Sequence, residues 1–296
     1  MKRIFLFVVT NLAVLLLLSI VLYILERVFG VHLAQGGTGS LLVFAAIFGF
    51  GGSLVSLAMS KWTAKRVMGV RVIENPQSEG ERWLVGTVKQ LADRAQLGMP
   101  EVGIFDAEEM NAFATGARRN AALVAVSTGL LRSMSRTQIE AVLGHEMTHV
   151  ANGDMVTLAL LQGVLNTFVI FFARIIGNII DRAVFRNDRQ GGGIGFFLTT
   201  IIAQFVLGLL ASVIVCWYSR RREFGADRGG ANLAGTGNMI AALQMLKRSQ
   251  GEPMPQQLQA FGINTGRSDG IMRLFMTHPP LDERIAALQS SAARTA

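Results

Sequence analysis

Two of the four histidines in this 296-residue chain stand four positions apart, in His145-Glu146-Met147-Thr148-His149. On a helix, side chains at positions i and i+4 project from one face, so both imidazoles can bind a single metal ion. Glu146 stands one residue further round, beside the ion, where a carboxylate can take a proton from a metal-bound water. The spacing predicts one zinc ion held by His145 and His149, with Glu146 as catalytic acid/base.

A catalytic zinc site takes a third protein ligand and leaves the fourth position to water. The metzincin motif would need a glycine and a histidine three and six residues after His149, where this chain has Asn152 and Met155. Two carboxylates at i and i+4, Glu223 and Asp227, follow the last apolar run instead. The pattern favours Glu223 as third ligand and Asp227 as acceptor from a ligand imidazole N–H. A charged helix with local ion pairs is the alternative.

The zinc motif requires a helix, and the residues before it mark where one begins. Ser135 and Gln138 have the spacing of a capping box, in which each side chain bonds the other residue's backbone N–H. An inward-facing apolar stripe follows, formed by Ile139, Val142, Leu143 and Val150. A second helical pattern runs over residues 79–97 and stops before Gly98 and Pro100.

Short strands are predicted between these two helices, at residues 101–106 and 121–127. The segment from Asn111 to Gly116 lies between them and has the pattern of a third, exposed strand. Unpaired backbone groups of an edge strand can recruit an extended peptide, so Asn111 and Phe113 are candidate substrate contacts. An ordinary sheet edge followed by a turn is the alternative interpretation.

The amino-acid composition indicates the environment of the protein. Hydrophobic residues make up 51% of the chain and charged residues 16%, against about 25% charged in soluble proteins. The apolar content excludes a disordered chain, and the single cysteine, Cys216, excludes a disulfide-stapled fold. The net charge is +8, but the basic residues cluster beside apolar runs. This placement favours a lipid bilayer, and not a nucleic acid, as the partner.

Four apolar runs are long enough to cross a hydrocarbon core, which takes about 20 helical residues. They lie at residues 4–25, 41–60, 155–173 and 194–218. The third and fourth could also be shallow or tilted. Basic residues flank the first pair on one side, with only Arg27 in the loop between them; they are Lys2, Arg3, Lys61, Lys65 and Arg66. This asymmetry predicts a cytoplasmic amino terminus, and a cytoplasmic domain built jointly from residues 61–154 and 219–296.

The ordered set of motifs resembles a known family, the membrane-embedded gluzincin peptidases, which include a bacterial heat-shock protease and, more remotely, the CAAX prenyl proteases. The resemblance runs essentially end to end. It is carried by the zinc motif and four further segments: Asn111-Ala112-Phe113-Ala114-Thr115-Gly116, Asn152-Gly153-Asp154, Arg222-Glu223-Phe224-Gly225-Ala226-Asp227, and Thr277-His278-Pro279-Pro280 with Arg284.

The resemblance implies an α+β membrane protein with four transmembrane helices, residues 1–60 and 155–218 forming two hairpins, and a cytoplasmic zincin-like metalloprotease domain of helices and a small sheet. It implies a zinc endopeptidase that degrades unfolded or misfolded membrane proteins in a bacterial inner membrane, with His145, His149 and Glu223 on zinc. It also suggests that His278 donates a hydrogen bond to the oxyanion or orients the substrate. The alternative is a histidine with a purely structural role in a turn.

Three rival functions stand beside this one. An intramembrane protease is disfavoured because the zinc helix begins with Ser135, Arg136 and Glu140, outside any apolar run. A prenyl-protein protease of the CAAX type is weakened because that group carries more spans than four. A non-catalytic polytopic scaffold with an accidental zinc motif remains as the alternative from another class, and such a scaffold binds no zinc.

Overall fold

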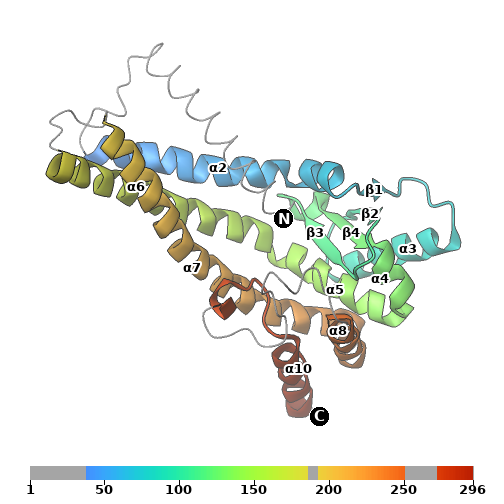
Figure 1. Ribbon diagram of the computed structural model, residues 1–296. Helices are drawn as coiled ribbons and strands as arrows, with labels where there is room; N and C mark the ends of the chain where they lie inside the picture. Colours follow the sequence, from blue (N-terminus) through green and yellow to red (C-terminus); the bar gives the residue numbers. More distant parts are fainter. Residues whose placement is uncertain (1–37, 186–192, 251–271, 296) are drawn as a thin grey trace. The chain divides into compact units, whose positions relative to one another are not determined.

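The computed structural model describes residues 38–185, 193–250 and 272–295 (Figure 1). The first predicted span, residues 4–25, lies outside the described residues. Internal contacts divide the chain into two compact units. The apolar unit contains the described residues up to Leu57 together with Thr157–Val215, and the sheet unit contains Ala58–Val156 together with the described residues from Cys216 onward.

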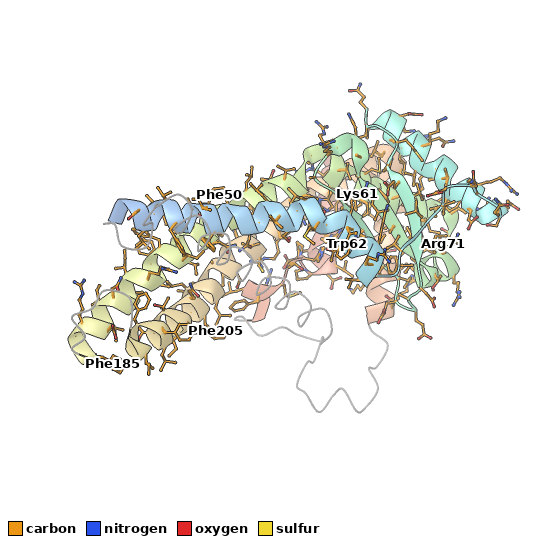
Figure 2. All side chains as sticks on the ribbon, turned by 90° about the horizontal axis from the view of Figure 1, so that it is seen from above. Phe50, Lys61, Trp62, Arg71, Phe185 and Phe205 are labelled. Atoms are coloured by element: carbon orange, nitrogen blue, oxygen red, sulfur yellow. The ribbon has the colours of Figure 1, made fainter. Side chains whose placement is uncertain are left out.

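Three helices supply the apolar unit: α2 (Thr38–Val67), α6 (Asp154–Phe185) and α7 (Ile194–Ala234). Within the described part of the chain, these three are long and apolar enough to cross a membrane. Each later predicted span falls inside one of them. Their large apolar side chains are extensively exposed, including Phe185 and Phe205 (Figure 2). Such continuous apolar surface is typical of helices that face lipid.

Helices α2 and α6 approach each other closely within the apolar unit because small residues line the contact. A Cβ atom added to Gly49 would lie 2.4 Å from Thr167 Oγ1, and one added to Gly163 would lie 2.9 Å from Ser53 Oγ. Each helix therefore presents two small residues four positions apart to its neighbour. This arrangement is typical of packed transmembrane helices, where close backbone approach supplies much of the attraction.

The sheet unit contains a four-stranded sheet in the order β1-β2-β4-β3, formed by β1 (Arg71–Val72), β2 (Glu101–Phe105), β3 (Ala112–Thr115) and β4 (Leu123–Ser127). Strands β2 and β4 are parallel, and the other two pairs are antiparallel. The predicted edge strand is confirmed as β3. Strand β1 was not predicted, because two residues are too few to show an alternating pattern.

The end of α2 belongs to the sheet unit and is attached to the first residue of β2. Lys61 Nζ lies 2.9 Å from Glu101 Oε1 and 2.8 Å from the Ala121 carbonyl oxygen, while Lys65 Nζ lies 2.6 Å from Glu101 Oε2. Two lysines that the sequence places at a membrane exit therefore also fix the helix to the sheet.

Both predicted helices of this unit begin at capping boxes. The first, α3 (Glu79–Arg94), begins at Ser78 with Glu81 as its reciprocal partner. It ends three residues earlier than expected, because Gln96 adopts φ 55° and the Leu97 N–H bonds the Ala92 carbonyl, which closes the helix. The zinc-motif helix, α5 (Arg136–Asn152), has the predicted Ser135–Gln138 box.

One hydrophobic core holds α5 in place. All four residues of its predicted inward stripe are buried. They pack in a cluster with buried side chains of α3, β4, α8 (Thr236–Gln250) and α10 (Leu281–Thr295). The described part of the unit also contains three short elements, namely α4 (Thr128–Ser133) and the 3-10 turns at Arg119–Ala121 (η1) and Met272–Phe275 (η2).

Candidate metal centre

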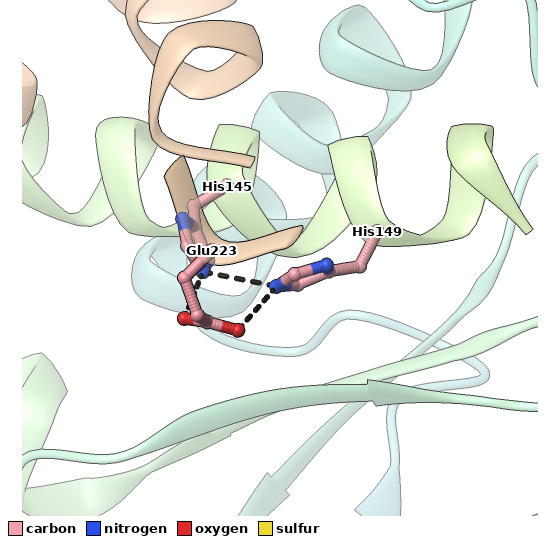
Figure 3. Close-up of side chains that lie close together, drawn as sticks. All are labelled: His145, His149 and Glu223. Atoms are coloured by element: carbon pink, nitrogen blue, oxygen red, sulfur yellow. Dashed lines mark hydrogen bonds and ion pairs between the residues drawn. The ribbon is translucent and has the colours of Figure 1, made fainter. Parts of the chain in front are cut away.

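Three side chains converge in the sheet unit, two from α5 and one from α7 (Figure 3). The Nε2 atoms of His145 and His149 lie 3.1 Å apart. Glu223 faces both of them, with Oε2 3.5 Å from His145 Nε2 and Oε1 3.3 Å from His149 Nε2. All three residues are buried, and their ligand atoms lie within 4.8 Å of one another. The structure thus brings together the three predicted ligands.

The other ring nitrogen of each imidazole, Nδ1, contacts a carboxylate. His145 Nδ1 lies 3.0 Å from Asp227 Oδ1, and His149 Nδ1 lies 2.5 Å from Asp154 Oδ2. A carboxylate acceptor places the proton on Nδ1, so each Nε2 directs a lone pair at the centre. Glu223 Oε1 also points there, and this buried oxygen has no hydrogen-bond partner. Two imidazole nitrogens and a carboxylate oxygen that converge in this way fit a metal cation.

The electrostatics of the cluster agree with a positive charge at its centre. Burial by itself lowers the pKa of His145, but hydrogen bonds to Asp227 and Glu223 outweigh it and raise that pKa to about 9. Burial likewise raises the pKa of Glu223, but His145, His149 and His278 outweigh it and hold that pKa far below its ordinary value. A metal ion would take the place of the proton that this environment favours.

Asp227 lies outside the ligand triangle, which is formed by His145, His149 and Glu223. It is itself held by Arg284 of α10. The guanidinium is bidentate, with Nε 2.8 Å from Oδ2 and Nη2 2.6 Å from Oδ1 of Asp227. Burial would raise the pKa of Asp227, but Arg284 and His145 outweigh it and lower that pKa. Arg284 is buried and its Nη1 also lies 3.6 Å from Glu223 Oε2. In the sequence analysis, Arg284 stands out only through the family resemblance. No local pattern predicts that it holds Asp227.

Asp154 holds the Nδ1 of His149 as Asp227 holds that of His145, and the sequence analysis does not predict this role. Gly153 ends α5 with φ 69°, a left-handed conformation that glycine adopts without strain. The chain turns there, and the first residue of α6 points back at the second histidine of α5. An aspartate directly after a glycine that ends the zinc helix is the signal that could have identified it.

Glu146 lies beside the ligand triangle and contacts the edge strand. Its Oε2 accepts a hydrogen bond of 2.9 Å from the Ala114 N–H of β3. Ala114 is buried in the core that holds α5, whereas Phe113 packs with Phe105 in a separate small cluster, with ring centroids 5.5 Å apart. The Asn111 N–H and carbonyl both bond Ser127 at the end of β4. Substrate contact by Asn111 and Phe113 stays a prediction.

His278 lies between the 3-10 turn η2 and α10, and it reaches the proposed third ligand. Its Nδ1 is 2.8 Å from Glu223 Oε2, while 61% of its side chain is exposed. This contact occupies one carboxylate oxygen of Glu223 and leaves Oε1 for the ion. The exposed imidazole therefore adjoins both the metal centre and the solvent from which a substrate arrives.

A capped helix with paired histidines and a neighbouring glutamate, a carboxylate from a second helix and an adjacent edge strand together define a zincin-like metallopeptidase. The model of Peptidase family M48 matches residues 78–292, and the chain belongs to that family. The chain is therefore a metallopeptidase, and the predicted resemblance is confirmed.

Two similar proteins are named proteases. Protease HtpX of Alkalilimnicola ehrlichii is 61% identical over 295 residues, covering 98% of each chain. Protease HtpX homolog of Thiobacillus denitrificans is 60% identical over 294 residues, covering 98% of this chain and 99% of that one. The crystal structure of S. mikatae Ste24p has a TM-score of 0.63 at 19% identity, covering 95% of this chain and 67% of the other. This last likeness concerns the fold.

Proposed function

We propose that this metallopeptidase is a zinc-dependent endopeptidase of a bacterial inner membrane, which cleaves misfolded membrane proteins on the cytoplasmic side. The observation that carries the proposal is the cluster of His145, His149 and Glu223, whose acceptor atoms converge beside Glu146. The apolar helices of the same chain support the membrane location. The names of the similar HtpX proteases support proteolysis as the activity.

Two imidazoles and one carboxylate form a donor set that suits zinc and leaves a coordination position open. We assign His145, His149 and Glu223 as its ligands, one ion per chain, with Asp227 and Asp154 as the acceptors that orient the two imidazoles. When bound, zinc polarises the scissile carbonyl and lowers the pKa of the attacking water. The membership of the chain in a peptidase family excludes the scaffold alternative.

The residues of this chain then move the proton. Glu146, held by the Ala114 N–H, accepts a proton from the attacking water as oxygen bonds to the carbonyl carbon. It returns that proton to the departing amine nitrogen as the C–N bond breaks. The exposed ring of His278 donates to the oxyanion or orients the substrate. The edge strand β3 aligns the extended substrate backbone, which favours unfolded segments over folded ones.

Metal removal tests this function directly. The full chain, purified in detergent and stripped with a chelator, should lose cleavage of an unfolded membrane-protein substrate, and one equivalent of zinc should restore it. The same substrate in its folded state is the control and should resist. Undiminished cleavage by the stripped protein, or no bound zinc after reloading, would contradict the proposal.

The proposed topology has four spans, in the hairpins of residues 1–60 and 155–218, with residues 61–154 and 219–296 together in the cytoplasm. Lysine and arginine stay on the cytoplasmic side, so a reporter fused after residue 70 or at the carboxyl terminus should read cytoplasmic. One inserted near residue 36 should read external. An external reading from the carboxyl-terminal fusion would disprove the shared cytoplasmic domain.

A further inference from the structure

One face of α7 contacts the carboxyl-terminal segment over three helical turns. Four residues spaced by four, three and four positions share that face: Cys216, Arg220, Glu223 and Asp227. The last two in the sequence belong to the metal centre, where Glu223 contacts His278 and Asp227 contacts Arg284. The first two, Cys216 and Arg220, have no part in the mechanism above.

Cys216 and Arg220 donate hydrogen bonds to backbone carbonyls of the segment just before His278. Arg220 Nη1 donates to the carbonyl oxygens of Leu274 at 3.0 Å and Met276 at 2.6 Å. Cys216 Sγ donates to the Phe275 carbonyl at 3.4 Å. The carbonyls at the end of a short 3-10 turn have no partner within the turn, so a guanidinium satisfies two of them at once.

The neighbouring arginines are used differently. Arg221 stacks over Trp217, with its Cζ 5.2 Å from the ring centroid, and Arg222 Nη1 lies 3.9 Å from Asp154 Oδ2. Successive helical residues point about 100° apart, so only one of the three faces the carboxyl-terminal segment. The run of three arginines is therefore more than a membrane-surface anchor, and the contacts of Arg220 are specific to its position.

We propose that Arg220 is a positioning residue, which fixes the turn at residues 272–275 so that the His278 ring stays against Glu223 and the substrate. The inference rests on the proposed catalytic part of His278. Two prolines restrict the backbone after this histidine, and Arg220 fixes the backbone before it. With 61% of its side chain exposed, His278 has little packing of its own to hold it.

The test compares Arg220→Gln with Arg221→Gln in the full chain, purified in detergent with zinc. Both substitutions remove one positive charge from α7, but only the first removes the two carbonyl contacts. Because misplacing a catalytic group by about 1 Å costs up to about 100-fold, Arg220→Gln should lower kcat by roughly 10- to 100-fold. Arg221→Gln should keep the wild-type kcat, and Arg220→Lys, which can still donate to one carbonyl, should fall between.

A double-mutant cycle shows whether Arg220 acts through His278. In a His278→Ala background, Arg220→Gln should cause no further loss of kcat. Zinc affinity of Arg220→Gln should not show the roughly 10- to 100-fold loss typical of a residue that supports a metal ligand. Independent, additive losses would overturn the inference, as would loss of zinc from Arg220→Gln or a wild-type kcat for that variant.

The same cycle separates this inference from the proposed function. If His278→Ala is impaired and Arg220→Gln is not, only the role of Arg220 is wrong. If His278→Ala keeps the wild-type kcat, the proposed part of His278 in the reaction is wrong, and the positioning role of Arg220 fails with it.

Discussion

Glu146→Gln should retain one metal ion per chain and lose peptidase activity by roughly 100- to 10,000-fold, the contribution of a general base. The amide keeps the shape of the side chain, and its oxygen can still accept the 2.9 Å bond from the Ala114 N–H. All three proposed ligands also remain. What the substitution removes is the group that takes the proton, so retention of the metal together with loss of activity is the informative result.

The measurement pairs bound zinc with cleavage of an unfolded substrate. Glu140→Gln is the matched control, because Glu140 lies on the same helix and pairs with Arg94 at 3.4 Å, away from the metal centre. It should behave as wild type. If Glu146→Gln cleaves at a rate near that of Glu140→Gln, the assigned role of Glu146 is wrong.

Glu223→Ala should weaken zinc binding more than any other carboxylate substitution in the centre. It removes a ligand and the negative charge that faces both imidazoles. Asp227→Ala and Asp154→Ala each remove a partner of an imidazole Nδ1. Their losses should be the roughly 10- to 100-fold typical of such supporting residues.

Competition against a graded set of chelators gives the order of the variants, with Glu140→Ala as control. Thermal unfolding should be measured beside it, because Asp227→Ala leaves the buried Arg284 guanidinium without its bidentate partner, whereas Asp227→Asn keeps an acceptor. If Asp227→Ala binds zinc less well than Glu223→Ala, the two roles must be exchanged. If neither differs from the Glu140 control, the third ligand lies elsewhere, with Asp154 and His278 as the remaining candidates.

The sequence predicts those parts of the centre that depend on local geometry. The spacing of His145 and His149 fixes their common face on any helix, and the Ser135–Gln138 box sets where that helix begins. The three described apolar helices and the edge position of β3 likewise follow from runs and alternation over a few residues. Each of these patterns is complete within one segment, so the rest of the fold does not alter it.

The tertiary structure decided which distant groups meet. Local spacing offers Glu223 and Asp227 as a pair, but only the packing of α7 beside α5 places Glu223 opposite both Nε2 atoms and Asp227 at the Nδ1 of His145. The support from Arg284 and the contact of Arg220 with the segment before His278 have no sequence periodicity at all. They join elements far apart in the chain, and such contacts arise from side-chain packing in three dimensions, which no local pattern encodes.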